Sequence, residues 1–287
     1  MTAVVPDPVS VGARTPVRTA TPRHYLMCPP SYFTVEYAIN PWMQPGIDVD
    51  RRRALAQWDA LRRTYLDLGH RVDLLAPMPG LPDMVYAANG ATVVDGTVLA
   101  ARFRHPQRAA EAVAHATWFR RAAARVVEPE FVNEGEGDLL VVGDLILAGH
   151  GFRTDPRAHA EAARVFGREV VSLELVDPRY YHLDTAVAVL DGTPGREHIA
   201  YLPSAFDGAS LALLQERYPD AIIVNETDAA VLGLNSFSDG CNVVIASRAT
   251  DFERQLREHG YNPIGVDLSE LLLGGGGVKC CTLELRR

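Results

Sequence analysis

The residue types with the clearest potential for chemistry lie near the carboxyl end of the chain, where the segment GGGGVKCC covers Gly274–Cys281. Glycines let a backbone approach a ligand closely. A phosphate-binding loop is excluded, because Lys279 is followed by Cys and the segment leads into a predicted strand instead of a helix. A cysteine beside hydrogen-bond donors or a cation can react as a thiolate. Adjacent strand residues face opposite ways, so at most one of Cys280 and Cys281 is the expected nucleophile; the alternative is that both are small buried apolar residues.

A histidine and a carboxylate occur together in YYHLDTAV, in the second half of the chain. His182 and Asp184 lie two positions apart on a predicted strand, so their side chains are expected on the same face. Histidine is the usual general acid/base near neutral pH, and a neighbouring carboxylate suits a cationic ligand. The alternative is a hydrogen-bonded pair with a structural role.

Three carboxylates precede an apolar strand in VNEGEGDLLV. Glu134, Glu136 and Asp138 alternate with glycines, but the segment lacks the longer ligand spacing of calcium loops. A solvated turn is an alternative. Carboxylates that enter a buried strand are costly unless they are paired, which favours a functional role.

A fourth group of polar residues surrounds the predicted strand in PDMVYAANGATVV. Asp83 and Asn89 flank its apolar residues, and Arg108 follows in FRHPQR. Arg153, in GHGFRTD, occupies the position equivalent to Arg108 in the next repeat. Two arginines at equivalent positions can clamp a carboxylate, whereas a single one would be read as a surface residue.

These segments belong to a repeat, which defines the elements that must position them. Four segments share the order strand, glycine-containing turn, strand, helix, strand. The turn glycines, spaced roughly 48 residues apart, are Gly96, Gly143, Gly192 and Gly240. The turns VDG, VGD, LDG and SDG join Val/Leu/Ile-rich runs, as in hairpins.

The two ends of the chain supply most of a fifth copy. Tyr25–Cys28 is predicted as a strand, Arg51–Leu68 as a helix and His70–Leu75 as the following strand. A closing strand at Lys279–Leu285 would complete the unit. The pattern therefore predicts an α/β fold in which five units form a closed ring; the alternative is an ordinary α/β sandwich with accidental spacing.

Composition narrows the possible partners. The chain has 287 residues, is 47% apolar and carries a net charge of −8 with no basic cluster, so nucleic acid is not an expected partner. No apolar run approaches the roughly 20 residues that a membrane span needs. The expected partner is a small molecule, and a cationic one suits the acidic surface.

Cysteine usage favours a cytoplasmic protein. No CxxC pair is present, and adjacent cysteines rarely form a disulfide framework. The cysteines are Cys28, Cys241, Cys280 and Cys281. Residues 1–23, rich in Pro, Thr and Arg, are predicted as a flexible tail, and 24–287 as a single domain.

The combination of motifs resembles the guanidino-group-modifying enzymes of the pentein superfamily, among them dimethylarginine dimethylaminohydrolases, arginine deiminases, arginine dihydrolases and amidinotransferases. The resemblance depends on EGEGD, GHGFRT, HLD and the glycine-rich loop with its cysteine, which occur in the same order as in the family. It covers nearly all of the predicted domain. The resemblance implies a five-bladed αβ-propeller, which agrees with the repeat.

The resemblance also implies roles for individual residues. Cys280 matches the family nucleophile, His182 the general acid/base, and Asp184 a carboxylate that binds the guanidinium. Arg108 and Arg153 match positions that bind the substrate carboxylate or shape its pocket.

Two departures from the family pattern leave choices open. The usual acidic motif has four residues, whereas EGEGD has five. Glu134 is the preferred carboxylate for pairing with the histidine or binding the guanidinium, and Glu136 is the alternative. Asn89 stands where deiminases and dimethylaminohydrolases usually have Asp, and Asp83 is a further candidate for the substrate pocket. Asn89, together with the segments EGEGD and YAINPWM, resembles the sequence pattern of the arginine dihydrolases more than that of the deiminases and dimethylaminohydrolases.

The implied reaction is attack of the thiolate on the guanidinium carbon, loss of an amine, and hydrolysis of a covalent thiouronium by water, with no metal or organic cofactor. The substrate would be arginine or an N-methylated arginine. Alternatives are an amidinotransferase and, remotely, a non-catalytic ribosome-binding pentein. The segment Cys28–Gly46 is a candidate lid, with Asn40 expected to point into the site. A homo-oligomer is compatible with this interpretation.

Overall fold

Five small β-sheets form the centre of the protein. The computed structural model describes residues 17–122 and 124–286, and within them each sheet has three strands. In every sheet the first strand is antiparallel to the second, which is parallel to the third. The sheets are β15–β1–β2 (Leu283–Glu284, His24–Met27, Arg71–Leu74), β3–β4–β5 (Ala91–Val94, Thr97–Ala100, Arg125–Val127), β6–β7–β8 (Leu139–Val142, Leu145–His150, Glu169–Glu174), β9–β10–β11 (Val187–Asp191, His198–Tyr201, Ile222–Ile223) and β12–β13–β14 (Phe237–Ser238, Asn242–Ala246, Asn262–Val266).

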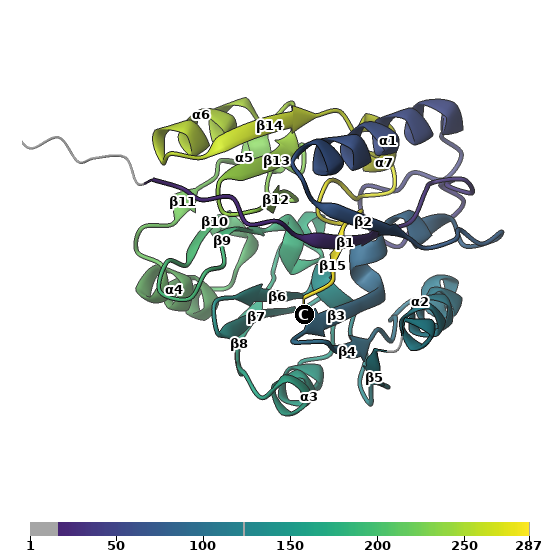
Figure 1. Cartoon of the computed structure of the whole chain (residues 1–287), viewed down its shortest axis with the longest axis horizontal. Coiled ribbons are helices and arrows are strands. Elements are labelled where there is room, and N and C mark those ends of the chain that lie inside the picture. The colour runs from purple at the N-terminus through teal and green to yellow at the C-terminus, as the bar shows by residue number, and fades with distance from the viewer. Residues whose placement is uncertain (1–16, 123, 287) are drawn as a thin grey trace, which may run out of the picture.

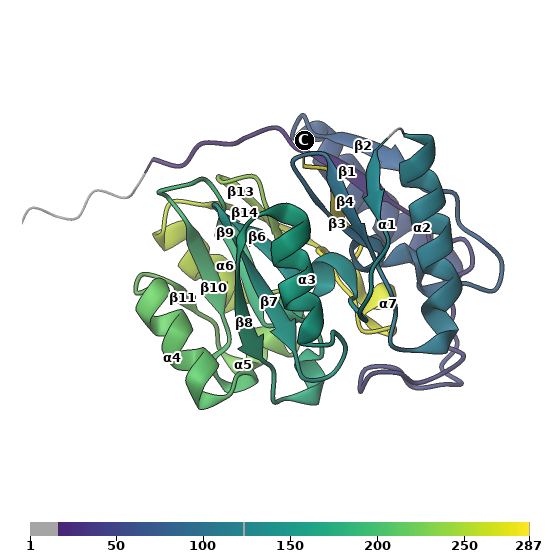
Figure 2. The ribbon, with the colours of Figure 1, turned by 90° about the horizontal axis from the view of Figure 1, so that it is seen from below.

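One long helix in each unit connects the second strand to the third. Parallel neighbours require such a crossover. These helices are α1 (Arg51–Asp67), α2 (Ala109–Arg121), α3 (Arg157–Phe166), α4 (Gly208–Arg217) and α6 (Thr250–Glu258), and they lie around the outside of the strands (Figures 1 and 2). Two shorter helices, α5 (Glu226–Ala229) and α7 (Ser269–Leu272), precede β12 and β15.

The predicted ring of five units is confirmed. Strand β15, from the end of the chain, pairs with β1, from its beginning, so that Leu26 lies opposite Leu283. The first strands of different sheets contact one another, as β9 does with β6 and β12, and therefore form the innermost layer. The arrangement is a five-bladed αβ-propeller.

Local sequence explains most of these boundaries. Asp95 and Gly96 both adopt positive φ, 49° and 73°, which suits the two-residue hairpin between β3 and β4. The Asp207 side chain accepts hydrogen bonds from the backbone at the start of α4. Gly192 departs from the predicted pattern, because the connection from β9 to β10 runs to Glu197 and its positive-φ glycine is Gly195.

The core lies between the sheets and the helices. Strands β3 and β10 are buried at all four positions, as expected for strands covered on both faces. Phe252 and Leu256 turn the apolar side of α6 inwards, as their spacing predicts.

The polar motifs lie in turns where strands were predicted. His182 and Asp184 precede β9, in a turn closed by hydrogen bonds from Thr185 N to His182 O (3.1 Å) and from Ala186 N to Leu183 O (2.9 Å). Asp83 and Asn89 likewise lie in the 3-10 turns Pro82–Val85 and Ala87–Gly90, ahead of β3.

The predicted closing strand Lys279–Leu285 was also too long. It is shortened to Leu283–Glu284, so both cysteines lie in the turn before it. These strand assignments were wrong because each apolar inner strand is preceded by a tight turn whose backbone bonds are satisfied locally.

The described part of the predicted tail contacts the propeller. Residues 1–16 lie outside the described residues. Arg18 stacks its guanidinium 4.1 Å from the centre of the Tyr261 ring, and Thr21 donates a 2.9 Å backbone hydrogen bond to Asp239. Residues 18–21 therefore lie along the blade formed by β12, β13 and β14.

Candidate active site

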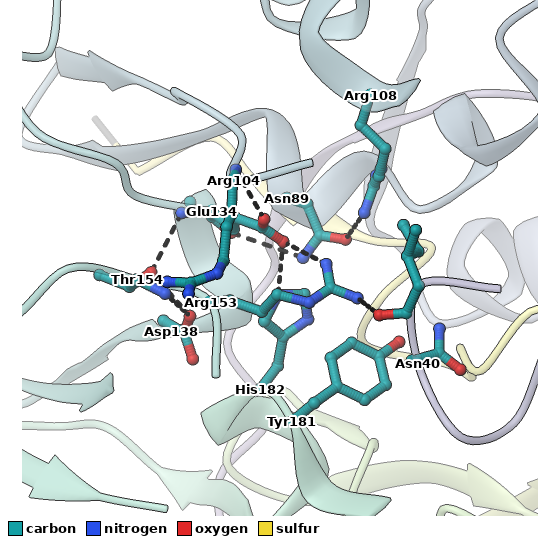
Figure 3. Close-up of polar contacts among 12 residues, drawn as sticks. Asn40, Asn89, Arg104, Arg108, Glu134, Asp138, Arg153, Thr154, Tyr181 and His182 are labelled. Carbon is teal, nitrogen blue, oxygen red and sulfur yellow. Dashed lines mark hydrogen bonds and ion pairs between the residues drawn. The ribbon is translucent and has the colours of Figure 1, made fainter. Parts of the chain in front are cut away.

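One end of the ring gathers polar residues from all five units. They lie in the turns that precede the five innermost strands, so the repeat itself brings them together. Asn89, Glu134, Asp184, Asn235 and Cys280 occupy these turns, and each is at most 2% exposed. Figure 3 shows part of this cluster around Glu134 and His182.

Glu134 holds the predicted general acid/base. Its Oε2 lies 2.7 Å from Nε2 of His182 and accepts a 2.8 Å hydrogen bond from Nη1 of Arg153, while Oε1 accepts from the backbone N–H of Arg104 at 3.1 Å (Figure 3). Burial alone would raise the pKa of this carboxyl, but Arg153 and His182 outweigh burial and hold the pKa of Glu134 well below its usual range.

This arrangement leaves one ring nitrogen of His182 for chemistry. Nδ1 is buried and has no hydrogen-bond partner among the described residues. Glu134, paired with Nε2 on the opposite side of the ring, fixes the orientation of the imidazole. His182 is therefore equipped to accept and return a proton through Nδ1.

Asp138 fixes the turn that carries His182. Its Oδ1 accepts the backbone N–H of Leu183 at 3.0 Å, and its Oδ2 accepts the Thr154 hydroxyl at 2.6 Å. The third carboxylate of EGEGD therefore bonds to neighbouring turns, and its hydrogen bonds set where His182 and Asp184 point.

The cysteine predicted to be the nucleophile contacts the predicted guanidinium-binding carboxylate. Cys280 Sγ lies 3.4 Å from Oδ2 of Asp184. Burial, followed by the Asp184 charge, raises the pKa of the Cys280 thiol well above its usual range. Burial also raises the pKa of Asp184 to about 6, although His182 and Lys279 favour its charged form. Without a cation beside them, the two groups are held as a thiol that donates to a carboxylate.

Asn235 completes the surroundings of the sulfur, and we did not predict it. Its Nδ2 lies 3.1 Å from Cys280 Sγ, and its Oδ1 accepts the backbone N–H groups of Gly277 and Cys280, both at 3.0 Å. The repeat contained the signal, because Asn235 precedes β12 as Asp184 precedes β9. Comparing these turn positions across the copies would have found it.

Glycines are required where backbones meet the site. A Cβ atom on Gly137 would lie 2.4 Å from the Asn89 amide nitrogen and 3.2 Å from the His182 ring. A Cβ atom on Gly276 would lie 2.3 Å from the Tyr86 ring. Such separations leave no room for a Cβ, so these glycines let the acidic turn and the cysteine loop approach the centre.

The two predicted arginines are buried but already have protein partners. Arg153 bonds to Glu134 and to the Ile39 carbonyl (2.9 Å), and its guanidinium lies 4.5 Å from the centre of the Tyr181 ring. Arg108 donates to Asn89 Oδ1 at 2.8 Å. The expected role of the two arginines toward a substrate carboxylate stays a prediction.

Arg108 also connects Asn89 to two further carboxylates. It pairs with Glu111 at 2.8 Å and lies 3.9 Å from the Asp83 carboxylate, whose Oδ2 accepts the Tyr37 hydroxyl at 2.8 Å. Asn89 Nδ2 makes a longer, 3.4 Å contact with the Glu134 carbonyl. Asn89 therefore lies between Arg108 and the turn that carries Glu134.

Glu136 and Asn40 have other contacts than those expected at the substrate. Glu136 pairs with Lys279 at 2.5 Å and with Arg286, so Glu134 is the carboxylate that contacts the histidine. Asn40 donates to the Gly274 carbonyl at 3.1 Å. Asn40 thus ties the segment Cys28–Gly46 to the glycine-rich loop, and through Ile39 this segment also contacts Arg153.

Two further observations concern other ligands and membranes. Within residues 17–122 and 124–286, no three His, Cys, Asp or Glu side chains are grouped so as to hold a metal ion. No helix in these ranges has the length and apolar character needed to cross a bilayer.

Known proteins resemble this chain over almost all of its length. No protein-family model matches it. It is 57% identical over 269 residues to the N(G),N(G)-dimethylarginine dimethylaminohydrolase of Mycobacterium tuberculosis. The aligned region covers 93% of this chain and 87% of that protein. It is 36% identical over 267 residues to the bifunctional arginine dihydrolase/ornithine cyclodeaminase ArgZ of Synechocystis sp., covering 91% of this chain and 37% of that longer protein.

Solved structures agree with these relatives. The N-terminal domain of ArgZ, a cysteine-to-serine variant bound to substrate, superposes with a TM-score of 0.87 at 34% identity, covering 92% of this chain and 98% of that one. A dimethylarginine dimethylaminohydrolase at 19% identity shares the fold with a TM-score of 0.75. The chain belongs to the family of guanidino-group-modifying hydrolases in the pentein superfamily, which includes the dimethylarginine dimethylaminohydrolases and the arginine dihydrolases.

Proposed function

We propose that this protein hydrolyses a guanidino C–N bond of L-arginine or an N-methylated arginine, with Cys280 as nucleophile. The observation that carries the proposal is the buried group formed by the Cys280–Asp184 contact and the His182–Glu134 pair at one end of the ring. Thiol, carboxylate and imidazole are the groups that this reaction requires.

Substrate binding would activate the thiol. A guanidinium placed beside Asp184 donates N–H groups to the carboxylate and takes the position of the thiol proton as its partner. The positive charge then favours both the carboxylate and the thiolate, whose pKa values are raised in the free protein. The thiolate therefore forms where its electrophile is already bound.

The first half-reaction forms a C–S bond and breaks a C–N bond. The Cys280 thiolate attacks the guanidinium carbon, and the thiol proton passes through His182 to the departing nitrogen, which leaves as ammonia or an amine. The product is a cationic thiouronium attached to Cys280. Glu134 stabilises His182 while its ring carries the proton.

The second half-reaction releases the cysteine. His182 removes a proton from water, which attacks the thiouronium carbon, and the C–S bond breaks to give a ureido product, citrulline. Asn235, which contacts the sulfur, stabilises the departing thiolate.

A second candidate product is favoured by Asn89. Its amide is neutral and carries both a donor and an acceptor, so it can hold a neutral ureido group nearly as well as a guanidinium. A second attack by Cys280 on the ureido carbon would release ammonia and leave a thiocarbamate on the cysteine. Water would hydrolyse its C–S bond, and the carbamate released would decompose to ornithine and carbon dioxide. The relative ArgZ is named as an arginine dihydrolase.

Product analysis tests both proposals. Purified protein is incubated with arginine, asymmetric dimethylarginine or citrulline, with and without glycine as an acceptor amine, and the products are quantified by mass spectrometry. Citrulline supports single hydrolysis, ornithine from arginine and citrulline supports two rounds, and a new guanidino compound formed only with glycine would replace hydrolysis with amidino transfer.

The variant Asn89→Asp separates one round from two. Arg108, 2.8 Å from Asn89 Oδ1, can pair with the new carboxylate, so the variant is expected to fold. Its charge favours the guanidinium over the neutral ureido group, so the ornithine-to-citrulline ratio should fall. Citrulline as the sole product of both proteins would exclude the second round.

A further inference from the structure

A cavity lies at the opposite end of the inner strands from the candidate active site. It has a volume of about 530 Å³ and is lined by the inner strands β6, β9, β12 and β15 and by the turns that follow β6 and β9. The candidate active site occupies the turns that precede the same strands, so the strands separate the two regions along their length. None of the residues assigned above to the reaction lines this cavity.

At two points, neighbouring residues of the chain face the candidate active site and the cavity. Asn235 and Cys280 contact each other in the candidate active site, whereas their chain neighbours Ser236 and Lys279 line the cavity behind. Any molecule bound in the cavity would therefore lie directly behind the nucleophile and its hydrogen-bond donor.

Cationic side chains dominate the charged lining. Arg23, Arg168, Lys279 and Arg286 line the cavity, against the carboxylates of Asp144 and Glu284. Arg168 pairs with the exposed Asp95 at 2.9 Å, and Asp144 is exposed at the rim.

The inner end of the cavity has an excess of positive charge. Arg23 pairs with Glu284 at 3.4 Å, Arg286 with Glu284 at 2.7 Å and with Glu136, and Lys279 with Glu136 at 2.5 Å. Three cations thus share two carboxylates through direct ion pairs, and the further carboxylate that acts on Lys279 is Asp184, in the candidate active site. The direct pairs leave one positive charge in excess within this group. Uncompensated charge at a partly buried site attracts a counter-ion.

Two hydrogen-bond donors in the cavity wall have no acceptor among the described residues. Ser236 is 5% exposed, and its hydroxyl makes no hydrogen bond; the Nε–H of Arg23 is also buried and unpaired. A buried donor without an acceptor is destabilising, so such groups usually meet a ligand or ordered water. Both are donors, as an anion would require.

We propose that this cavity is a binding site for a small oxyanion, a carboxylate or a phosphate. The hydroxyl of Ser236 and the guanidinium of Arg23 donate to its oxygens, and the shared charge of Lys279 and Arg286 neutralises it. The volume exceeds that of one such ion, so a small organic molecule carrying the anionic group also fits.

Calorimetric titration with sodium phosphate and, separately, sodium acetate tests the assignment on the full-length protein at constant ionic strength. Phosphate or acetate should bind the wild type. Ser236→Ala and Arg23→Gln should each weaken binding by roughly tenfold or more, since each removes a hydrogen bond to a charged ligand. Acetate bound at least as tightly as phosphate would identify the group as a carboxylate, and the reverse order as a phosphate.

Controls separate loss of the site from loss of the fold. Arg217→Gln removes an exposed arginine outside the cavity, paired with Glu169, and should leave anion affinity unchanged. Ser236→Ala should melt no lower than the wild type without anion, because it removes an unsatisfied buried hydroxyl.

The proposal is overturned if neither anion binds the wild type, or if both cavity variants bind as the wild type does. It is also overturned if agmatine, which carries the guanidinium of arginine without its carboxylate, displaces the anion competitively from the Cys280→Ala protein, because the anion would then occupy the candidate active site. None of these outcomes depends on turnover, so they are distinct from failure of the proposed reaction.

Discussion

Asp184 and Cys280 share one buried contact, and burial disfavours the charged form of each. The pKa of Asp184 is raised to about 6 and that of the Cys280 thiol lies well above its usual range. In the free protein the Cys280 thiol therefore stays protonated, whereas a cationic substrate beside it would lower its pKa and favour the thiolate. Below about pH 6, protonated Asp184 should bind a guanidinium weakly, so kcat/KM should fall on the acid side.

Asp184→Asn should separate stability from activity. The folded pKa of Asp184 is above its unfolded value of 3.8, so ionisation costs folding stability as the pH rises from about 4 to about 6. The cost above pH 6 is at most about 3 kcal/mol. An asparagine side chain cannot ionise, so the variant should be more stable than wild type at pH 7.5, nearly equal at pH 4, and inactive. Urea unfolding at both pH values measures this; equal stability at pH 7.5 would contradict it.

Cys280→Ser and Cys281→Ser should differ sharply. Both cysteines belong to an apolar cluster with Tyr65 and Leu271, but Cys280 also contacts the polar side chains of Asp184 and Asn235. Serine at 280 should reduce kcat by about 10³-fold or more, while serine at 281 should cost about 1–3 kcal/mol of stability and leave most activity. Steady-state rates with circular dichroism provide the comparison, and equal losses in two folded variants would disprove the assignment.

The outcome at single residues shows what the sequence could predict. Glu134 was the preferred carboxylate for pairing with the histidine or binding the guanidinium, and it contacts His182; the direct contact of Cys280 with Asp184 was not predicted. Asn235 was missed because an asparagine in LNSFSD has no distinctive chemistry until the fold brings it to the sulfur. The partners of Glu136 depend on Arg286, 150 positions away, and no local pattern encodes that contact.

Among the elements, the 3-10 turn Gly135–Gly137 connects the histidine and the cysteine turn of the candidate active site. Glu134, just before it, contacts His182, and Glu136, within it, contacts Lys279, the neighbour of Cys280. Burial would raise the pKa of Glu136, but Arg286 and Lys279 outweigh burial and lower it. Glu136 is therefore ionised at neutral pH and acts as a positioning residue for the cysteine turn.

Glu136→Gln should reduce both stability and turnover. The variant leaves Lys279 without its carboxylate partner and Arg286 with Glu284 alone; breaking a buried ion pair typically costs about 3–5 kcal/mol. Well below the melting temperature, kcat should fall several-fold with KM little changed, because Glu136 sets the position of Cys280 without touching substrate. Adding Lys279→Met should restore part of the stability but not kcat; an unchanged kcat in folded Glu136→Gln would exclude a positioning role.

Element types and boundaries were predictable to different degrees. Helix α1, with Trp58 and Leu61 on its buried face, matches the predicted Arg51–Leu68 because its apolar spacing persists over 17 residues. The inner strands were predicted too long at the polar motifs. Strand propensity cannot identify the point at which a tight turn satisfies the backbone instead.

For the molecule as a whole, closure of the ring depends on two short strands. Tyr25 and Leu26 pair with Glu284 and Leu283, and Leu283 is fully buried. The fivefold period predicted this closure, because the first and last segments each lacked the strands of a full unit. The same strand β15 follows the turn that holds Cys280.

Leu283→Pro should open the ring, and Leu283→Ala is its matched control. Both lose the buried side chain, at about 2–5 kcal/mol, but only proline also removes a backbone N–H from β15. Proline should therefore abolish activity and broaden the thermal transition, while alanine should lower the melting temperature and keep a single cooperative transition. Differential scanning calorimetry distinguishes them; identical traces would show that backbone pairing at Leu283 is dispensable.

The position of β15 also has a consequence for biosynthesis. Strand β1 is synthesised roughly 250 residues before β15, the strand with which it pairs antiparallel. At 5–20 residues per second, β1 has one edge unpaired for roughly 13–50 s, which favours association with other nascent chains or with a chaperone. Cys280, the proposed nucleophile, is translated only just before that partner. A chain released before this point lacks both β15 and Cys280, so it could not carry out the proposed reaction.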